Sequence, residues 1–104
     1  MLRCVDDSLY TGITNNIENR MNDHFSQGKR CAKYTMSHKA KKLECVWQTE
    51  DKVLASKLEY RIKQLNKPSK EQLIINHKIE EVLPIDKIDY TKYKVIEVKY
   101  HYEG

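Results

Sequence analysis

Three side chains suited to phosphate chemistry lie close together near the start of the chain: Tyr10, Arg20 and His24. Arginine offers a planar fork of donors that fits two phosphate oxygens, and histidine can orient a group or relay a proton. A tyrosine phenol near a cation can activate a water molecule. The residues alone leave ordinary alternatives open: a surface arginine paired with Glu18 or Asp23, a structural histidine, and a tyrosine packed in the core.

A strand followed directly by a helix would bring these side chains to one region. Leu9, Thr11 and Ile13 alternate with Tyr10 and Gly12, which is the period of a strand. We therefore expect Tyr10 to lie on a short strand that leads into the next helix.

That helix is expected over residues 16–25. Thr14 or Asn15 can cap its first turn, because a short side-chain oxygen accepts a hydrogen bond from a free N–H there. Arg20 and His24 are four residues apart and share a face. An apolar stripe of the same spacing faces the core and consists of Ile17, Met21 and Phe25.

A second helix carries a carboxylate at the edge of its apolar stripe. Glu59 follows Leu58 directly, and a carboxylate there can hold a Mg²⁺ ion that keeps several waters. By spacing alone, an ion pair with Lys63 is the more ordinary interpretation. The stripe consists of Leu54, Leu58, Ile62 and Leu65.

A third helix is expected beyond Pro68. The segment Asn66–Pro68 closes the second helix, because proline cannot continue one. Ser69 can then cap a helix that runs to about Ile79.

The other segments predict strands. Met1–Val5 is expected to pair with the strand of Tyr10 in a hairpin, Leu43–Gln48 to form a third strand, and Val95–Tyr102 to form a strand because it alternates. The expected fold is α+β: a small three-stranded antiparallel sheet flanked by helices, in the order strand, strand, helix, strand, helix, helix, with an added C-terminal strand.

Positive charge gathers in one segment of the chain. The formal net charge is +4 and the pI is about 8.9. Between Gln27 and Cys45 the only acidic residue is Glu44, which predicts binding to a polyanion, with a solvated loop as the alternative. The basic residues there are Lys29, Arg30, Lys33, Lys39, Lys41 and Lys42.

The composition indicates one globular domain. Of its 104 residues, 39% are hydrophobic and 33% charged, which does not fit a disordered chain. No apolar run reaches membrane-spanning length and no signal peptide is expected. Three cysteines without paired spacing favour a reducing, cytoplasmic or other intracellular compartment and argue against a zinc site.

An ordered series of motifs runs through most of the chain. It begins with Tyr10-Thr11-Gly12 and an asparagine-rich helix start, continues with Arg20, His24 and Ala32-Lys33-Tyr34-Thr35, and ends with the helical Glu59. The series resembles the second half of the GIY-YIG nuclease motif, over roughly residues 1–75, and is most similar to the small stand-alone members. The tripeptide alone is weak evidence, whereas the whole ordered series is much stronger.

The resemblance implies an endonuclease that hydrolyses phosphodiester bonds in DNA with Mg²⁺ or Mn²⁺, in DNA repair or processing. The catalytic residues would be Tyr10, Arg20, His24 and Glu59, with Glu59 as the metal ligand. The residues that bind DNA would be Arg20, Lys29, Arg30, Lys33 and Tyr34. The nuclease domain would span residues 1–82, and residues 83–104 would be a C-terminal extension with a strand in the same compact unit.

One part of the family's pattern is not found. The GIY half of the motif places a tyrosine on the first strand, which here begins at Met1-Leu2-Arg3-Cys4. Compared with ordinary strands, the front is shorter by about four or five residues. Three explanations stay open: a misplaced start, a degenerate relative that does not cut, or replacement by the C-terminal strand with Tyr100 and Tyr102.

Two other functions remain open. A catalytically inactive module of the same fold would still bind nucleic acid through Arg20, Lys33 and the basic segment, and a basic protein-interaction domain would fit the composition alone. A chain this small favours recognition of DNA shape or branches over base sequence. The C-terminal strand leaves a monomer and a homodimer both open, since an edge strand can pair between two chains.

Overall fold

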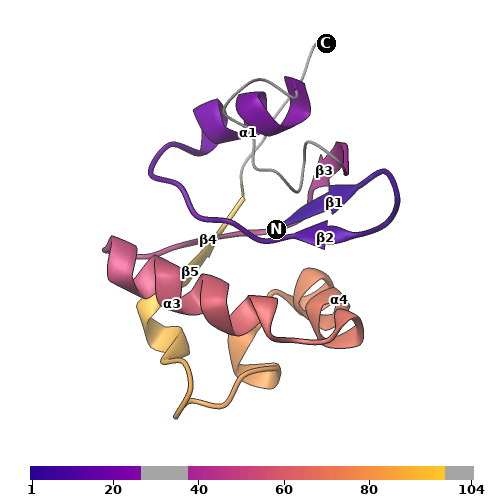
Figure 1. Cartoon of the computed structure of the whole chain (residues 1–104). Coiled ribbons are helices and arrows are strands. Elements are labelled where there is room, and N and C mark those ends of the chain that lie inside the picture. The colour runs from indigo at the N-terminus through magenta and orange to yellow at the C-terminus, as the bar shows by residue number, and fades with distance from the viewer. Residues whose placement is uncertain (27–37, 98–104) are drawn as a thin grey trace. The chain divides into compact units, whose positions relative to one another are not determined.

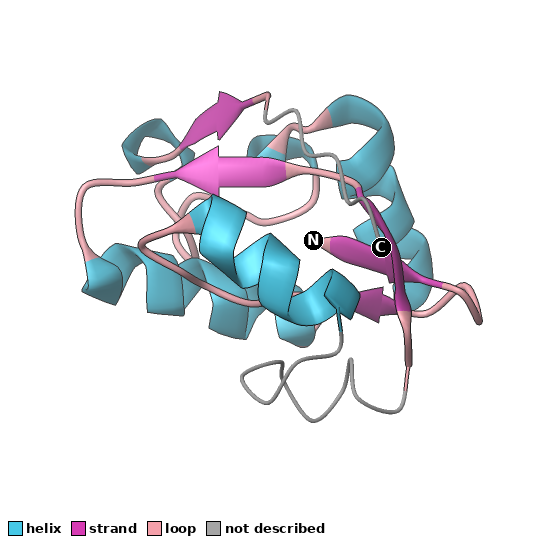
Figure 2. Cartoon of the chain, turned by 90° about the horizontal axis from the view of Figure 1, so that it is seen from above, coloured by secondary structure: helices cyan, strands magenta, loops and turns pink. Residues whose placement is uncertain are grey.

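The computed structural model describes residues 1–26 and 38–97 of the chain. The chain divides into two compact units, whose described parts are residues 1–26 with 38–44 and residues 45–97 (Figure 1). Both units combine strands with helices (Figure 2), which confirms the predicted α+β fold. None of the helices in the described ranges is long and apolar enough to span a membrane.

The first unit contains a three-stranded antiparallel sheet. Its strands are β1 (Leu2–Cys4), β2 (Leu9–Tyr10) and β3 (Ala40–Leu43), in the order β2-β1-β3. The hairpin between β1 and β2 is tight, because the Cys4 N–H donates to the Ser8 carbonyl at 2.9 Å and Asp7 adopts φ 70°. The predicted hairpin is therefore confirmed, although β2 ends at Tyr10.

Helix α1 (Ile17–Ser26) packs on this sheet through its predicted apolar stripe. Met21 is buried with Leu2 and Ala40, and Ile17 and Phe25 pack against this cluster. The stripe repeats every helical turn, so it faces the strands along its whole length.

The cap of α1 differs from the prediction. Asn16 accepts a hydrogen bond from the Asn19 N–H at 3.2 Å, so Asn16 caps the helix instead of Thr14 or Asn15. The Thr14 hydroxyl bonds both the N–H and the carbonyl of Asn16, at 3.0 and 3.1 Å. Thr14 thus shapes the turn that precedes the helix.

The predicted third strand, Leu43–Gln48, proves to be parts of two strands. Strand β3 ends at Leu43, and β4 (Val46–Gln48) begins a second sheet with β5 (Lys94–Ile96). Apolar residues continue through both strands, so the local pattern did not mark the break. Within the described residues β5 pairs with β4 and not with β1, and Tyr100 and Tyr102 lie outside those residues.

The second unit is built on α3 (Lys52–Lys63). The Asp51 carboxylate caps it by accepting from the Leu54 N–H at 2.8 Å, and Leu58 and Ile62 are buried as the stripe predicted. The short 3₁₀ helices η1 (Ile79–Glu81) and η2 (Tyr90–Lys92) connect α4 to β5.

Helix α4 (Lys67–Asn76) begins earlier than predicted. Asn66 is its cap and accepts from the Ser69 N–H at 3.0 Å, so Ser69 lies inside the first turn. Pro68 is tolerated there because the first N–H groups of a helix have no intrahelical partner. The helix ends before Ile79, since His77 adopts the left-handed conformation with φ 59°.

Candidate functional site

The strand and the helix of the first unit bring Tyr10 against His24. The two ring centroids are 5.1 Å apart, with the ring planes tilted by 55°. The Tyr10 ring also lies over Gly12, because a Cβ atom added to Gly12 would meet both Cε1 and Oη of Tyr10 at 2.9 Å. Glycine in the Tyr-Thr-Gly motif therefore leaves the space that the tyrosine ring occupies.

His24 is buried and its charge is disfavoured. His24 is 1% exposed, and its pKa is lowered from 6.5 to about 4. Burial is the largest cause, the positive charges of Arg20 and of the amino terminus add to it, and Asp23 acts in the opposite direction. The imidazole is thus neutral at pH 7, with one nitrogen that donates and one that accepts.

Arg20 lies one turn before His24 on α1 and is half-buried. The backbone N–H of Arg20 donates to the backbone carbonyl of Asn16 at 3.1 Å, which is the first backbone hydrogen bond between the cap residue and the helix. The Arg20 charge lies close enough to His24 to lower the pKa of the imidazole. Since His24 also contacts the Tyr10 ring, a cation, a neutral imidazole and a phenol lie in one part of the first unit.

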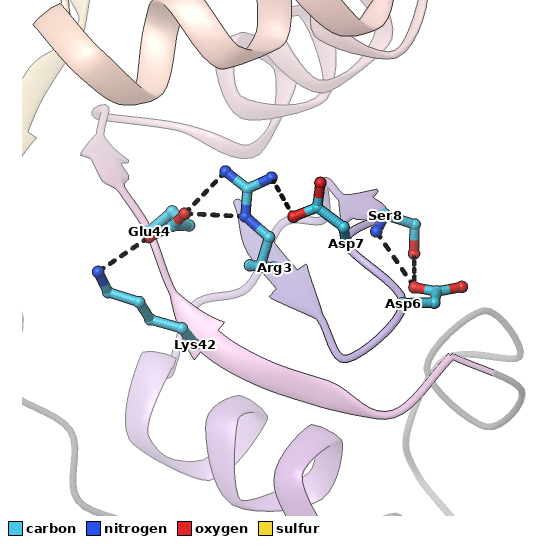
Figure 3. Close-up of polar contacts among 6 residues, drawn as sticks. All are labelled: Arg3, Asp6, Asp7, Ser8, Lys42 and Glu44. Atoms are coloured by element: carbon cyan, nitrogen blue, oxygen red, sulfur yellow. Dashed lines mark hydrogen bonds and ion pairs between the residues drawn. The ribbon is translucent and has the colours of Figure 1, made fainter.

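A charged cluster that the sequence did not predict joins β1, the hairpin turn and Glu44 (Figure 3). Arg3 bonds Glu44 Oε2 through both Nε and Nη2 at 3.0 Å, and its Nη1 pairs with Asp7 at 3.1 Å. Lys42 approaches the other Glu44 oxygen at 3.3 Å. Arg3 and Glu44 are only 15% and 10% exposed, so this pair is largely withdrawn from water. Opposite charges on two predicted strands were the signal that could have shown it.

The hairpin turn has its own polar support. The Asp6 carboxylate accepts from both the N–H and the hydroxyl of Ser8 (Figure 3), and it pairs with Nδ1 of His38. These hydrogen bonds, those of Ser8 first, hold the pKa of Asp6 well below its usual range. The turn is thereby fixed just before the strand that carries Tyr10.

Glu59 belongs to the second unit. It lies on α3 beside the buried Leu58, its side chain is 25% exposed, and its Oε2 is 3.7 Å from the Lys63 ammonium. The ordinary ion pair expected from the spacing is therefore present. A partly exposed pair at this distance is weak, so the carboxylate oxygens remain available to a stronger cation.

Several predicted nucleic-acid contacts fall outside the described residues: Lys29, Arg30, Lys33 and Tyr34. The rest of the basic segment is described, and it adds exposed lysines next to or within β3, namely Lys39, Lys41 and Lys42. Exposed positive charge thus lies along and just before β3.

The described residues contain no group of three or more histidine, cysteine or acidic side chains that could enclose a metal ion. Cys4 and Cys45 are buried, and burial raises the pKa of the Cys4 thiol. Among the described side chains, Glu59 offers a single carboxylate, and Mg²⁺ is commonly held by one or two carboxylates while it keeps several waters.

Comparison with known families decides the assignment. Residues 1–72 match the model of the GIY-YIG catalytic domain. The chain belongs to the GIY-YIG family. That match covers both the Tyr10–His24 segment and Glu59, and it ends within α4.

Similar GIY-YIG relatives come from several bacteria. A UPF0213 protein of Fusobacterium nucleatum is 42% identical over 74 residues, which is 71% of this chain and 72% of the relative. A UPF0213 protein of Clostridium perfringens is 43% identical over 82 residues, covering 78% of this chain and 85% of the relative. The UPF0213 protein YhbQ of Salmonella typhimurium is 37% identical over 83 residues, which is 80% of this chain and 81% of the relative. No solved structure gives a significant match.

Proposed function

We propose that this protein is a Mg²⁺-dependent endonuclease of the GIY-YIG type that hydrolyses phosphodiester bonds in DNA. Membership of the GIY-YIG catalytic family supports the reaction class. The observation that carries the proposal for this chain is the contact of Tyr10 with a buried, neutral His24 beside Arg20. Burying a polar ring such as that of His24, which is 1% exposed, costs stability. Such a ring is not expected beside a tyrosine that only fills the core.

The first unit would perform the phosphate and proton chemistry. The Arg20 guanidinium would bind two non-bridging phosphate oxygens and offset the negative charge that grows in the transition state. Tyr10, in its phenolate form beside the Arg20 charge, would accept at Oη the proton of the attacking water. His24, neutral, buried and packed on the Tyr10 ring, would hold Tyr10 in place.

The second unit would hold the metal. Glu59 supplies a hard carboxylate oxygen whose present partner, Lys63, is 3.7 Å away and weakly bound. A bound Mg²⁺ would act as a Lewis acid toward the phosphate and its leaving oxygen. The single carboxylate of Glu59 therefore fits Mg²⁺, the divalent ion that we propose for this site.

DNA would be bound through its phosphates by the basic segment. The described lysines Lys39, Lys41 and Lys42 are exposed, and Lys29, Arg30, Lys33 and Tyr34 of the same segment would join them. Binding of this kind releases counterions, so the affinity for DNA should fall steeply as salt rises.

The test is nicking of supercoiled plasmid and of a branched duplex with and without Mg²⁺ or Mn²⁺. The unmodified chain should cut only with metal, and Glu59→Gln should reduce cutting about 100-fold or more, as loss of a group that stabilises a transition state does. Glu50→Gln is the matched control, because Glu50 is an exposed glutamate of the same unit. Equal cutting by the two variants would contradict the proposal.

A second candidate, a module that binds DNA without cutting, has one observation in its favour. Strand β1 holds Leu2, Arg3 and Cys4 and so contains no tyrosine of the GIY half. This candidate predicts salt-sensitive DNA binding with no metal-dependent cutting in any variant. The nicking assay with a parallel binding measurement therefore separates the two.

A further inference from the structure

The second unit contains a pocket of about 240 Å³ whose lining does not include Glu59. Trp47 of β4 and Val95 of β5 form one wall as direct antiparallel partners, and Tyr90 and Tyr93 form another. Lys78 and Glu80 complete the lining beyond the end of α4. Apart from Trp47, all these residues follow residue 72, where the match to the catalytic domain ends.

The aromatic walls are held in place by named contacts. The Tyr93 hydroxyl donates to the Leu54 carbonyl at 2.7 Å, so its ring is anchored to α3. Tyr90 lies in η2, whose cap Asp89 accepts from the Thr91 N–H at 3.1 Å, and the Tyr90 side chain is 39% exposed. One ring is thus fixed inside and one is accessible at the rim.

Trp47 also carries a buried donor that lacks an acceptor within the described residues. The indole Nε1 of Trp47 is buried and has no hydrogen-bond partner within the described residues. An unsatisfied buried donor costs roughly 1–3 kcal/mol, and such groups are rare in folded proteins. Because Nε1 has almost no accessible surface, a ligand in the pocket would contact the rest of the Trp47 side chain and not this N–H.

Charged groups of both signs border the pocket. Lys78 is exposed, and its pair with Glu81 is long at 4.0 Å, so its ammonium is readily available to an anion. The Glu80 carboxylate can accept a hydrogen bond from an amine. Aromatic side chains in the lining and a cation at the rim together suit a planar base attached to a phosphate.

We propose that this pocket binds one unpaired nucleobase of a single-stranded segment in the nucleic-acid substrate. The cavity is smaller than the roughly 300–1,000 Å³ of pockets for drug-sized molecules, so it fits one planar ring system. Stacking on Tyr90 and Trp47 would supply affinity, and Lys78 would bind the adjoining phosphate. The inference rests on the proposed nucleic-acid substrate and needs no cleavage.

Trp47 is the only tryptophan in the chain, so its fluorescence reports on the pocket directly. The full chain is titrated without divalent metal with a short single-stranded oligodeoxynucleotide, and separately with the matched duplex. The single strand should quench Trp47 in a saturable way, and the duplex should bind without comparable quenching. Fluorescence anisotropy of labelled DNA measures total binding in the same samples.

Tyr90→Ala should weaken binding of the single strand roughly 5- to 150-fold, the range for loss of one stacked base. The matched control is Tyr60→Ala, which removes a 57% exposed tyrosine of α3 that does not line the pocket. Equal quenching by the duplex, or unchanged affinity in Tyr90→Ala, would overturn the inference. DNA binding without any change at Trp47 would also overturn it, and the nicking assay would still decide the proposed nuclease.

Discussion

The two units of this chain bury different kinds of side chain. In the first unit the buried residues include two polar ones, Thr11 and His24, and a largely buried pair joins Arg3 to Glu44. In the described part of the second unit the fully buried side chains are apolar, with Leu58, Ile62 and Leu73 among them.

This difference parallels the separate roles that we propose for the two units. Burying polar groups costs stability unless they are paired, and the first unit bears that cost where Tyr10, Arg20 and His24 come together. The described part of the second unit has an apolar core with two isolated buried polar atoms, Nε1 of Trp47 and Nε of Arg61. It presents Glu59 at the edge of its apolar stripe. The comparison predicts that apolar truncation damages the second unit most, while charge and pH act mainly on the first.

The largest effect on stability is expected from Ile62→Ala. Ile62 is 1% exposed in the core of the second unit, and truncation of such a residue costs about 2–5 kcal/mol through lost burial and a new cavity. Val53→Ala on the same helix is the control, because Val53 is 75% exposed and should change the free energy of unfolding by less than about 0.5 kcal/mol. Urea unfolding measures both, and equal effects would contradict the placement of the core.

Arg3→Ala should destabilise the protein by about 3 kcal/mol, because it leaves the Glu44 carboxylate largely buried without its closest cation. Lys42 pairs with the same carboxylate but its side chain is 70% exposed. Lys42→Ala should therefore cost only a few tenths of a kcal/mol. The same urea experiment compares them, and a larger loss in Lys42→Ala would show that burial does not decide the strength of these pairs.

Acid should destabilise the first unit through His24. Its folded pKa of about 4 lies below the unfolded 6.5, so the unfolded chain binds the proton more tightly. Stability is thus full above about pH 6.5 and is lost as pH falls toward 4, by about 2 kcal/mol between pH 7.5 and pH 5. In His24→Gln this loss should be much smaller. An unchanged pH dependence in that variant would show that another group titrates.

The smallest effect concerns the start of α4. Asn66→Ala removes the oxygen that accepts from the Ser69 N–H and should cost about 1 kcal/mol. Ser69→Ala should change stability by only a few tenths, since Ser69 contributes its backbone N–H. Thermal unfolding measures both variants. A larger loss of stability in Ser69→Ala than in Asn66→Ala would contradict this placement and would show that Ser69 is the cap.

The sequence predicted those features that repeat along the chain. The stripe containing Leu58 and Ile62 recurs at helical spacing, and the segment from Leu9 to Phe25 shows strand period followed by helical period. Both predictions are confirmed. The cap of α4 was missed because Asn66 and Ser69 lie on either side of Lys67-Pro68 and either residue type can cap a helix. Only the backbone geometry shows that Asn66 is the cap.

Contacts between distant residues could not be predicted in this way. Arg3 and Glu44 are 41 positions apart, and no local period connects them. The resemblance predicted Tyr10 and His24 as site residues, which stays a prediction, but their ring contact and the burial of His24 depend on how β2 and α1 pack. The break between β3 and β4 was hidden because the residues on both sides of it look like strand.

The central claim is that the first unit acts on the phosphate and Glu59 holds the metal. The most direct test is the single-turnover rate of plasmid nicking as a function of Mg²⁺ concentration for the unmodified chain, Arg20→Ala and Glu59→Gln. We predict that Arg20→Ala lowers the maximal rate about 100- to 1,000-fold with little change in the Mg²⁺ concentration at half-maximal rate, whereas Glu59→Gln removes saturation by Mg²⁺. A Glu59→Gln protein that keeps the same maximal rate at the same Mg²⁺ concentration would contradict the account.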